Sequence, residues 1–325
     1  MMDWLGQILP APVSDIAIAS GDASFRRYFR VRYDGVSRIV MDAPPEHENC
    51  RLFVTVANAF EALGLHVPGI LEADLEHGFL LLTDLGNRQY LKALNDTSAK
   101  RLYSDALDAL ARLQRGGNPE TQLLPPYDAA LLHREMELFR EWFLGYHLGL
   151  TLPDTEHRIL DDAFAILCDN ALEQPKVWVH RDYHSRNLMV TEDANPGILD
   201  FQDAVVGPIT YDLVSLLRDC YIAWPRPRVE AWALSHRATL QALGLQRLGN
   251  EATFLRWFDL MGVQRHLKAI GIFARLNRRD GKPGYLRDIP HTLRHILDIT
   301  ARYPELKRLH GLLLERVVAA AGVSA

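Results

Sequence analysis

The stretch from Val177 to Asp203 limits the folds open to this 325-residue chain more than any other part of it. It reads VWVHRDYHSRNLMVTEDANPGILDFQD, in which an apolar run precedes His-Arg-Asp and two further short runs enclose a turn. This order predicts a strand, a loop and then a tight strand–turn–strand. The pairing of 188–190 with 197–199 would bring Asn187 and Asp200, which flank the hairpin, side by side.

The side chains of this stretch suit the transfer of a phosphoryl group. Mg²⁺ takes oxygen ligands from carboxylates, amides, waters and phosphates, and Asn187 and Asp200 supply an amide oxygen and a carboxylate. Asp182 can then accept the proton of a substrate hydroxyl. The spacing His-Arg-Asp-x-x-x-x-Asn is that of the catalytic loop of protein kinases, where the Asp is the base and the Asn binds metal. We therefore predict that Asp182 is the catalytic base and that Asn187 and Asp200 bind Mg²⁺, while His180 braces the loop.

A second interpretation of the same loop is a zinc site. His180, Asp182 and His184 alternate along the chain, and on one face of a strand they would point to the same side. Neither a third histidine nor a glutamate follows in a matching pattern, and Asn187 and Asp200 would then have no role. The zinc site is therefore the weaker alternative.

The first 86 residues predict a small antiparallel sheet with one helix. Alternating or apolar runs predict five strands, at 16–20, 25–33, 37–41, 70–73 and 79–83. Apolar residues at helical spacing predict a helix over 48–63. After Gly86 helical periodicity dominates, near 97–115, 128–149, 154–173, 209–222, 227–244, 250–279 and 288–320. We predict a nucleotide-binding lobe over 1–86, and a mostly helical lobe over 87–325 that holds the catalytic loop and the acceptor pocket.

Two turns of the predicted sheet are candidates for contact with a nucleotide. The turn after the first strand is small and polar, and such a turn can present backbone N–H groups to phosphate oxygens. Its residues are Gly21, Asp22, Ala23 and Ser24. The strand at 79–83 runs into a second polar turn, whose backbone could pair with the edge of an adenine. That backbone belongs to Thr83, Asp84 and Leu85.

Composition narrows the choice of partner and compartment. The 36 basic and 41 acidic residues give a net charge of −5, which argues against binding to nucleic acid or to an anionic membrane. The three cysteines form no CxxC pair, so we expect reduced thiols rather than disulfides. Neither a secretory signal nor an apolar run long enough to span a membrane is visible. We expect a cytoplasmic protein and a monomer.

Five segments together resemble the aminoglycoside phosphotransferase family, the small-molecule branch of the protein-kinase-like fold. They are SGDASFRRYF at 20–29, FLLLTDLG at 79–86, HRDYHSRN at 180–187, LDFQD at 199–203 and GPITYDLVSLL at 207–217. The resemblance covers most of the chain. It implies a bilobal α+β fold, with a small antiparallel β lobe and a larger helical lobe, and the use of ATP and Mg²⁺. It also implies that the turn Gly21–Ser24 covers the ATP phosphates, that Thr83–Leu85 meets adenine, and that Asp212 steadies the catalytic loop.

Two further segments resemble one branch of that family, the kinases that phosphorylate the anomeric hydroxyl of N-acetylmuramate and N-acetylglucosamine. They are IVMDAPPE at 39–46 and QRHLKAIGIFARL at 264–276. The resemblance implies an amino sugar as acceptor, a sugar 1-phosphate as product and a place in peptidoglycan recycling. An aminoglycoside or an amino alcohol is the alternative acceptor, although such cations would favour an acidic pocket.

One position departs from the pattern of these kinases. Their third strand carries a lysine that pairs with the ATP phosphates and with a helix glutamate, and Met41 stands there in this chain. A thioether cannot neutralise phosphate charge. Arg26, Arg27 and Arg30 on the neighbouring predicted strand are the candidate substitutes, and Arg26 and Arg30 would share a face of it. Without a substitute, either ATP binds weakly or phosphoryl transfer is lost, and in the second case the chain would be a non-catalytic nucleotide-binding pseudokinase.

The acceptor residues are marked less clearly. Four polar side chains flank the predicted catalytic residues and could contact sugar hydroxyls: His184, Arg186, Gln202 and Asp203. Trp224 could stack on a pyranose ring. The segment 264–287 carries seven basic side chains and one acid, an excess typical of a solvated helix face. Alternatively, its Arg265 and Arg275 bind the lactyl carboxylate of N-acetylmuramate in a bidentate fork.

Overall fold

A computed structural model describes residues 1–21 and 25–321 of the chain. The chain folds into two units and crosses between them more than once. Unit 1 comprises Met1–Leu113 and Arg186–Asp203, and unit 2 comprises Gln114–Ser185 and Ala204–Ala325. The predicted combination of a small antiparallel sheet and a larger helical region is confirmed. Unit 1 extends past residue 86, and a functional division at that residue stays a prediction.

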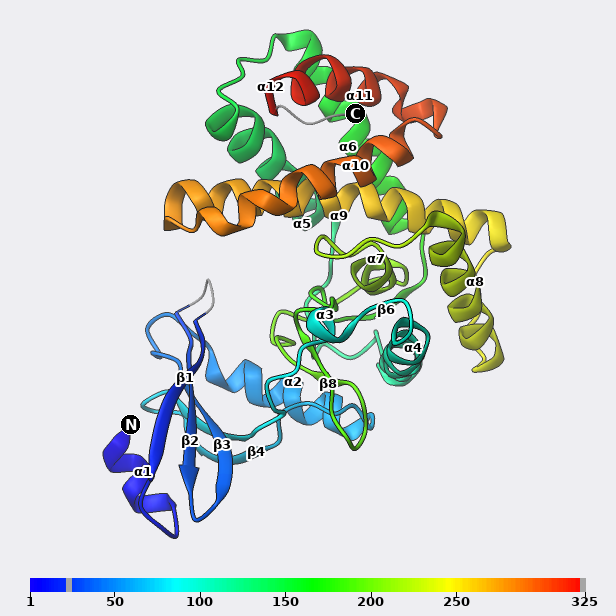
Figure 1. Cartoon of the computed structure of the whole chain (residues 1–325). Helices are drawn as coiled ribbons and strands as arrows, with labels where there is room; N and C mark the ends of the chain where they lie inside the picture. The colour runs from blue at the N-terminus through cyan, green and yellow to red at the C-terminus, as the bar shows by residue number, and fades with distance from the viewer. Residues whose placement is uncertain (22–24, 322–325) are drawn as a thin grey trace. The chain divides into compact units, whose positions relative to one another are not determined.

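Unit 1 contains a five-stranded antiparallel sheet with the strand order β1-β2-β3-β5-β4 (Figure 1). Its strands are β1 (Asp15–Gly21), β2 (Arg27–Tyr33), β3 (Val36–Asp42), β4 (Ile70–Asp74) and β5 (Phe79–Thr83), close to the predicted runs. Asp34 and Gly35 join β2 to β3 with φ angles of 46° and 74°, which suits a two-residue Asp-Gly hairpin. This tight turn fixes the register in which Met41 of β3 pairs with Tyr28 of β2.

One face of the sheet is covered by α1 (Met2–Ile8), which packs Leu5 against Val31, Val40 and Leu81. This helix was not predicted, because seven residues are too few to show helical periodicity. Residues on the opposite face of β2 and β3, among them Tyr28 and Met41, point away from this cluster, since side chains alternate along a strand.

The predicted helix over 48–63 is confirmed as α2 (Cys50–Ala62). It begins at Asn49, whose side chain accepts a hydrogen bond from the Leu52 N–H and so satisfies one of the open N–H groups of the first turn. Its buried Phe53 and Phe60 contact the ring of Phe201, with centroids 4.8 and 5.8 Å away. The helix therefore anchors the segment that follows Asp200.

The hairpin predicted in the 177–203 stretch is present and belongs to unit 1. It consists of β7 (Leu188–Met189) and β8 (Gly197–Ile198), which pair antiparallel. The Ile198 N–H donates to the His66 carbonyl and the Val190 N–H to the Arg88 carbonyl, each at 2.7 Å. These backbone hydrogen bonds connect the hairpin to the segment before β4 and to the segment after β5.

The helices α3 (Tyr90–Ala93) and α4 (Ala99–Gly116) follow the sheet in sequence.

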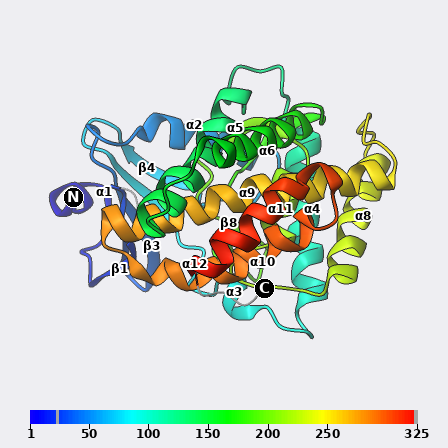
Figure 2. The same ribbon diagram turned by 90° about the horizontal axis from the view of Figure 1, so that it is seen from above.

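Unit 2 is built around α9 (Glu251–Asp280), a 30-residue helix that Figures 1 and 2 show running through the helices of this unit. Its buried residues lie on all sides, as in a helix enclosed by others. Gly271 marks the closest crossing, because a Cβ there would lie 2.3 Å from the carbonyl carbon of Leu138. Around it lie α5 (Ala129–Leu138), η1 (Phe139–His147), α6 (Asp154–Leu172), α7 (Tyr211–Leu217), α8 (Arg226–Ala242), η2 (Pro283–Asp288) and α10 (Ile289–Thr300).

Three predicted features of unit 2 differ in detail from the structure. The helix expected near 209–222 spans only Tyr211–Leu217 in α7. The helix expected over 128–149 changes to π-helical geometry in η1, and the one expected over 288–320 is interrupted before Pro304, which cannot donate a helical hydrogen bond. The last segments are η3 (Pro304–Leu306), α11 (Lys307–Leu312), η4 (Leu313–Val318) and α12 (Ala319–Ala321). A small sheet of β6 (Lys176–Val179) and β9 (Val205–Pro208) leads into the catalytic loop. Among the described residues, none of the helices is long and apolar enough to cross a membrane.

Candidate active site

The predicted catalytic loop begins in unit 2, where α7 holds its backbone. Asp212 of α7, which is fully buried, accepts hydrogen bonds from the N–H groups of His180 and Arg181 at 2.6 and 3.0 Å. Asp219 accepts the Ser185 N–H at 2.9 Å. The Asp182 N–H lies 3.2 Å from Nδ1 of His180, so His180 braces the loop as expected. Asp182 is thus presented on a backbone fixed on both sides by carboxylates.

Strain in the backbone also marks this loop. Arg181, directly before Asp182, has a φ of 77°, and Asp200 has a φ of 64°. Such values are uncommon for residues with a Cβ, and they persist where surrounding contacts hold them in place. The residue directly before the predicted base and one of the two predicted metal ligands are therefore held in sparsely populated conformations.

Cations around Asp182 keep its carboxylate ionised. Burial alone would raise the pKa of Asp182, but Lys268, His184, Arg265 and Arg181 lower it to about 2. Asp182 can therefore accept a hydrogen bond from a hydroxyl throughout the neutral pH range.

Two of these cations, Arg181 and Lys268, belong to a buried network that was not predicted from the sequence. Glu135 of α5 forms an ion pair with Arg181 and a second one with Lys268 at 3.1 Å, and the hydroxyl of Tyr127 donates to it. Lys268 also donates to the hydroxyl of Tyr211 at 3.0 Å. Burial would raise the pKa of Glu135, but Lys268 and Arg181 hold it below its usual value. The network therefore fixes two cations on the unit 2 side of the catalytic loop.

The basic segment of α9 is only partly the solvated face that composition suggested. Arg265 and Lys268 are buried, so for these two residues that expectation was wrong. Arg265 points its Nη1 toward the sulfur of Cys220 at 3.7 Å. Arg275 is half-buried, its Nε has no hydrogen-bond partner among the described residues, and burial lowers its pKa. By contrast, Arg278 on the same helix is exposed.

Two other candidate acceptor residues of unit 2 lie against aromatic rings. The ring of His184 meets Tyr221 edge-on, with centroids 5.4 Å apart. Trp224 contacts the guanidinium of Arg228 at 4.5 Å and meets Trp232 edge-on at 5.9 Å. Arg228 therefore covers part of the indole that was expected to stack on a sugar.

The predicted metal ligands lie together in unit 1. Nδ2 of Asn187 is 3.3 Å from Oδ2 of Asp200, and the Leu199 N–H donates to the Asn187 carbonyl at 2.9 Å. Gln202, which is buried, donates to Oδ1 of Asp200 at 2.7 Å, while its Oε1 has no partner among the described residues. An amide oxygen, a carboxylate and a buried oxygen without a donor form a set that fits Mg²⁺.

The zinc alternative is not supported. The strand β6 ends at Val179, so His180, Asp182 and His184 lie in a loop and do not share the face of a strand. Within the described part of the chain, His, Cys, Asp and Glu form no group of three that could hold a metal ion.

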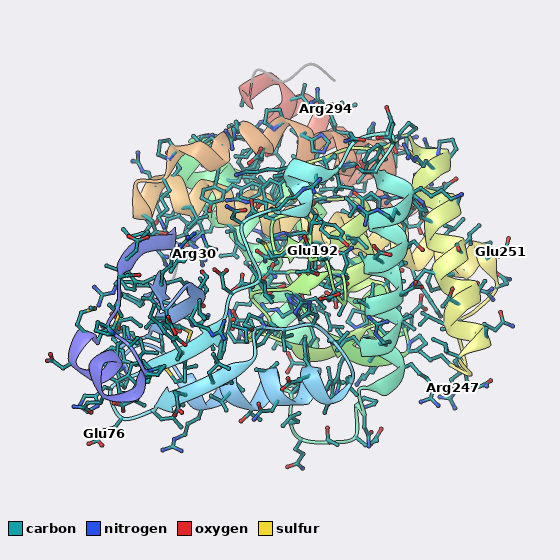
Figure 3. All side chains as sticks on the ribbon, turned by 60° about the horizontal axis from the view of Figure 1, so that its bottom comes forward. Arg30, Glu76, Glu192, Arg247, Glu251 and Arg294 are labelled. Atoms are coloured by element: carbon teal, nitrogen blue, oxygen red, sulfur yellow. The ribbon has the colours of Figure 1, made fainter. Side chains whose placement is uncertain are left out.

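The second nucleotide turn is held by an ion pair that crosses the sheet. Arg30 of β2, labelled in Figure 3, donates from Nε and Nη2 to Asp84 at 2.6 and 2.9 Å. Ser37 and the Gly86 N–H also donate to Asp84, whose pKa is low because these donors outweigh burial. Thr83 is paired through its backbone N–H with the Gly69 carbonyl at 2.9 Å. Arg30 thus shapes this turn.

The first predicted nucleotide turn follows β1. Gly21 is the last residue of β1, and Asp22, Ala23 and Ser24 lie outside the described residues.

The remaining candidates lie near the metal ligands of unit 1. Gln89 donates to the Arg186 carbonyl at 2.9 Å. Arg26 forms an ion pair with Glu48 at 2.7 Å, and Asp203 and Asp200 are among the charges that raise its pKa. Glu48 was not singled out from the sequence, although the lysine–glutamate pair of kinases is a signal that could have pointed to an acid near the start of α2.

Comparison with known proteins identifies the family of the chain. The family model for the phosphotransferase enzyme family matches residues 15–248. An N-acetylmuramate/N-acetylglucosamine kinase of Pseudomonas putida is 50% identical over 94% of this chain and 89% of its own length. The kinase of the same name from Pseudomonas aeruginosa is 48% identical over 95% of this chain and 94% of its own. Among solved structures, ADP-bound aminoglycoside phosphotransferase APH(2'')-Ib superposes with a TM-score of 0.61 at 14% identity, over 91% of this chain and 97% of the other.

The last of these likenesses concerns the fold alone, and it agrees with the kinase-like arrangement of strands and helices predicted from the sequence. The match to the family model and the two relatives extend over most of the chain and include Asp182, Asn187 and Asp200 within their span. The chain therefore belongs to the phosphotransferase enzyme family.

Proposed function

We propose that the protein transfers the γ-phosphoryl group of ATP to the anomeric hydroxyl of N-acetylmuramate or N-acetylglucosamine, which yields a sugar 1-phosphate and ADP. The observation that carries this proposal is the identity of 48 and 50% to two kinases named for these sugars, over almost the whole chain. Such an enzyme would act on sugars recovered from peptidoglycan. A cytoplasmic monomer stays a prediction.

Asp182 is the residue that acts on the acceptor in this proposal. Its ionised carboxylate accepts a hydrogen bond from the sugar hydroxyl and takes up the proton as the new O–P bond forms. Because phosphoryl transfer depends mostly on positioning and charge neutralisation, a carboxylate with a low pKa suffices for this step. The bonds from Asp212 to the loop backbone keep Asp182 in place.

The donor side of the reaction belongs to the hairpin of unit 1. Asn187 and Asp200 would hold Mg²⁺, which neutralises charge on the ATP phosphates when it is bound. The backbone of Thr83–Leu85 would meet the adenine, since the side chain of Asp84 is already engaged by Arg30. The turn Gly21–Ser24 would cover the phosphates.

For the acceptor, the proposal keeps the polar residues near the catalytic loop as contacts for sugar hydroxyls: His184, Arg186, Gln202 and Asp203. Trp224 would offer the part of its ring that Arg228 leaves uncovered. Arg265 would contribute charge from its buried position. Arg275 is the candidate for the lactyl carboxylate, because its Nε lacks a partner among the described residues.

The experiment that tests the function is a measurement of ADP release from Mg-ATP with a panel of acceptors. We expect turnover with N-acetylmuramate and N-acetylglucosamine, and none with glucose, kanamycin or choline. Turnover with kanamycin or choline would show that the acceptor is an aminoglycoside or an amino alcohol instead of an amino sugar. No turnover with any acceptor, together with intact ATP binding, would favour the pseudokinase that Met41 raised as an alternative.

Replacement of Arg275 by Ala is expected to raise the KM for N-acetylmuramate about tenfold and to leave the KM for N-acetylglucosamine unchanged. Only N-acetylmuramate carries the carboxylate, and a charge-assisted hydrogen bond contributes roughly 1.5–3 kcal/mol. Steady-state kinetics with both sugars measure the effect, and Arg278→Ala, an exposed arginine on the same helix, is the matched control. Equal changes for the two sugars would exclude the carboxylate contact.

A further inference from the structure

The nucleotide site of unit 1 lacks the lysine that kinases place on their third strand. Met41 occupies that strand and is fully buried, so it offers no charge to a phosphate. The ATP of the proposed function carries several negative charges, and phosphotransferases neutralise part of this charge with a cation of the protein. A cation from elsewhere in unit 1 must therefore take this role if the chain turns over ATP.

Most arginines of the sheet are engaged elsewhere. Arg27 is paired with Asp42, on the face opposite to Met41. Arg30 is held by Asp84 through two hydrogen bonds and by the Gly86 carbonyl through a third at 2.8 Å. Arg38 donates to the Ser37 carbonyl, and Arg32 is exposed beside Ser37 at the far end of β2. None of these four is directed to the metal ligands by a contact seen in the structure.

Arg26 differs from all four. Its side chain is only 14% exposed, and its Nη2 pairs with Glu48 at 2.7 Å. The other oxygen of Glu48 accepts the Phe25 N–H at 3.3 Å, so one carboxylate fixes both the backbone before Arg26 and its guanidinium. Glu48 itself is 10% exposed. Arg26 directly precedes β2 and Glu48 precedes the N-cap of α2, so this pair of a cation and a carboxylate is comparable to the lysine–glutamate pair of kinases but lies just outside the strand and the helix.

Several ionisable groups of unit 1 act on the guanidinium of Arg26. Burial lowers its pKa, but Tyr28, Glu48, Asp203 and Asp200 raise it, and the net result is a raised pKa. Asp200 is the predicted metal ligand, and Asp203 follows it in the same segment of unit 1. Tyr28 pairs with Met41 across β2 and β3, and paired residues share a face of the sheet. Arg26 lies two residues before Tyr28, and it is close enough to Asp200 and Asp203 for their charges to act on it.

We infer that Arg26, positioned by Glu48, binds the phosphate chain of ATP in place of the lysine that Met41 replaces. The inference rests on the proposed use of ATP and adds the residue that neutralises its phosphates. A guanidinium suits this position, because its planar set of N–H donors can bind a carboxylate and a phosphate at the same time.

The test compares the binding of Mg-ATP and AMP by Arg26→Met and Arg26→Lys. We expect Arg26→Met to weaken Mg-ATP binding and kcat together, with a loss in kcat/KM for ATP of about 100-fold or more, as for removal of one donor to developing charge. AMP lacks the β- and γ-phosphates, so it would lose little when Arg26 is replaced. The affinity for AMP should therefore change less than about twofold. Arg26→Lys should retain part of the activity. Arg27→Met, which changes the adjacent and more exposed arginine at the start of β2, is the control.

Two results would overturn the inference. One is an unchanged kcat/KM for ATP in Arg26→Met, and the other is an equal loss of ATP and AMP binding, which would mean a structural role. If Arg26→Met does not fold, Glu48→Gln decides the matter: it should lower kcat more than it weakens AMP binding, and an unchanged kcat would contradict the positioning role of Glu48. Because the binding measurements need no acceptor, they test Arg26 even if no amino sugar is turned over, an outcome that would count against the proposed function instead.

Discussion

Asp182→Asn is expected to lower kcat by a factor of about 1,000 or more and to leave the affinity for Mg-ATP within about threefold, in line with the size of general-base effects. The amide keeps the volume of the carboxylate but cannot take up the proton of the acceptor hydroxyl. It also removes the negative charge on which Lys268, His184, Arg265 and Arg181 act, so these groups would no longer stabilise a proton acceptor at this position.

The measurement is ADP release under saturating N-acetylglucosamine, with ATP affinity determined separately by titration. Asp162→Asn, the same change at an exposed position on α6, is the matched control and should behave as the unaltered protein. A kcat that stays within about tenfold would show that another group accepts the proton, because a positioned base contributes at least that much. A parallel loss of ATP affinity would instead assign Asp182 to the donor side.

The parts of the fold that follow from local rules were predictable. Alternation gave the strands of unit 1, the Asp34-Gly35 pair gave the β2–β3 turn, and the 177–203 stretch gave the β7–β8 hairpin that brings Asn187 to within 3.3 Å of Asp200. In each case the residues that interact are close in sequence. Their spacing therefore carries the geometry.

The interactions that escaped prediction join residues that are far apart in sequence. The Arg30–Asp84 pair crosses from β2 to the turn after β5, and nothing in either segment alone indicates the other. The basic residues of α9 looked like a solvated face because composition does not show that Glu135, on another helix, enters the same core. Glu48 escaped for a related reason, since its partner Arg26 lies just before β2 and not on the strand of the expected lysine.

Glu135→Leu is expected to lower the stability of the protein by about 3–5 kcal/mol, the usual cost when one partner of a buried ion pair is removed. Without Glu135, the buried Lys268 and the largely buried Arg181 lose the carboxylate that both contact. The free energy of unfolding from urea titration measures the loss. Glu137→Leu, two residues further along α5, is the control: its side chain is 31% exposed and pairs with His133 and Arg140, so the change should cost far less, since surface ion pairs contribute about 0–1 kcal/mol.

A double variant separates loss of charge compensation from loss of packing. Glu135→Leu with Lys268→Met removes one buried cation together with the acid, so the double variant should recover part of the stability that Glu135→Leu loses. If the loss in the double variant equals the sum of the losses in the two single variants, Glu135 and Lys268 do not act as a unit.

The pH dependence of stability gives a second check. Because the pKa of Glu135 is lowered in the folded protein, its stabilisation is present above the pKa of an ordinary glutamate and is lost as the pH falls through the lower folded value. The unaltered protein should therefore lose more stability in acid than the double variant, and identical acid profiles would mean that Glu135 does not hold the two cations by charge.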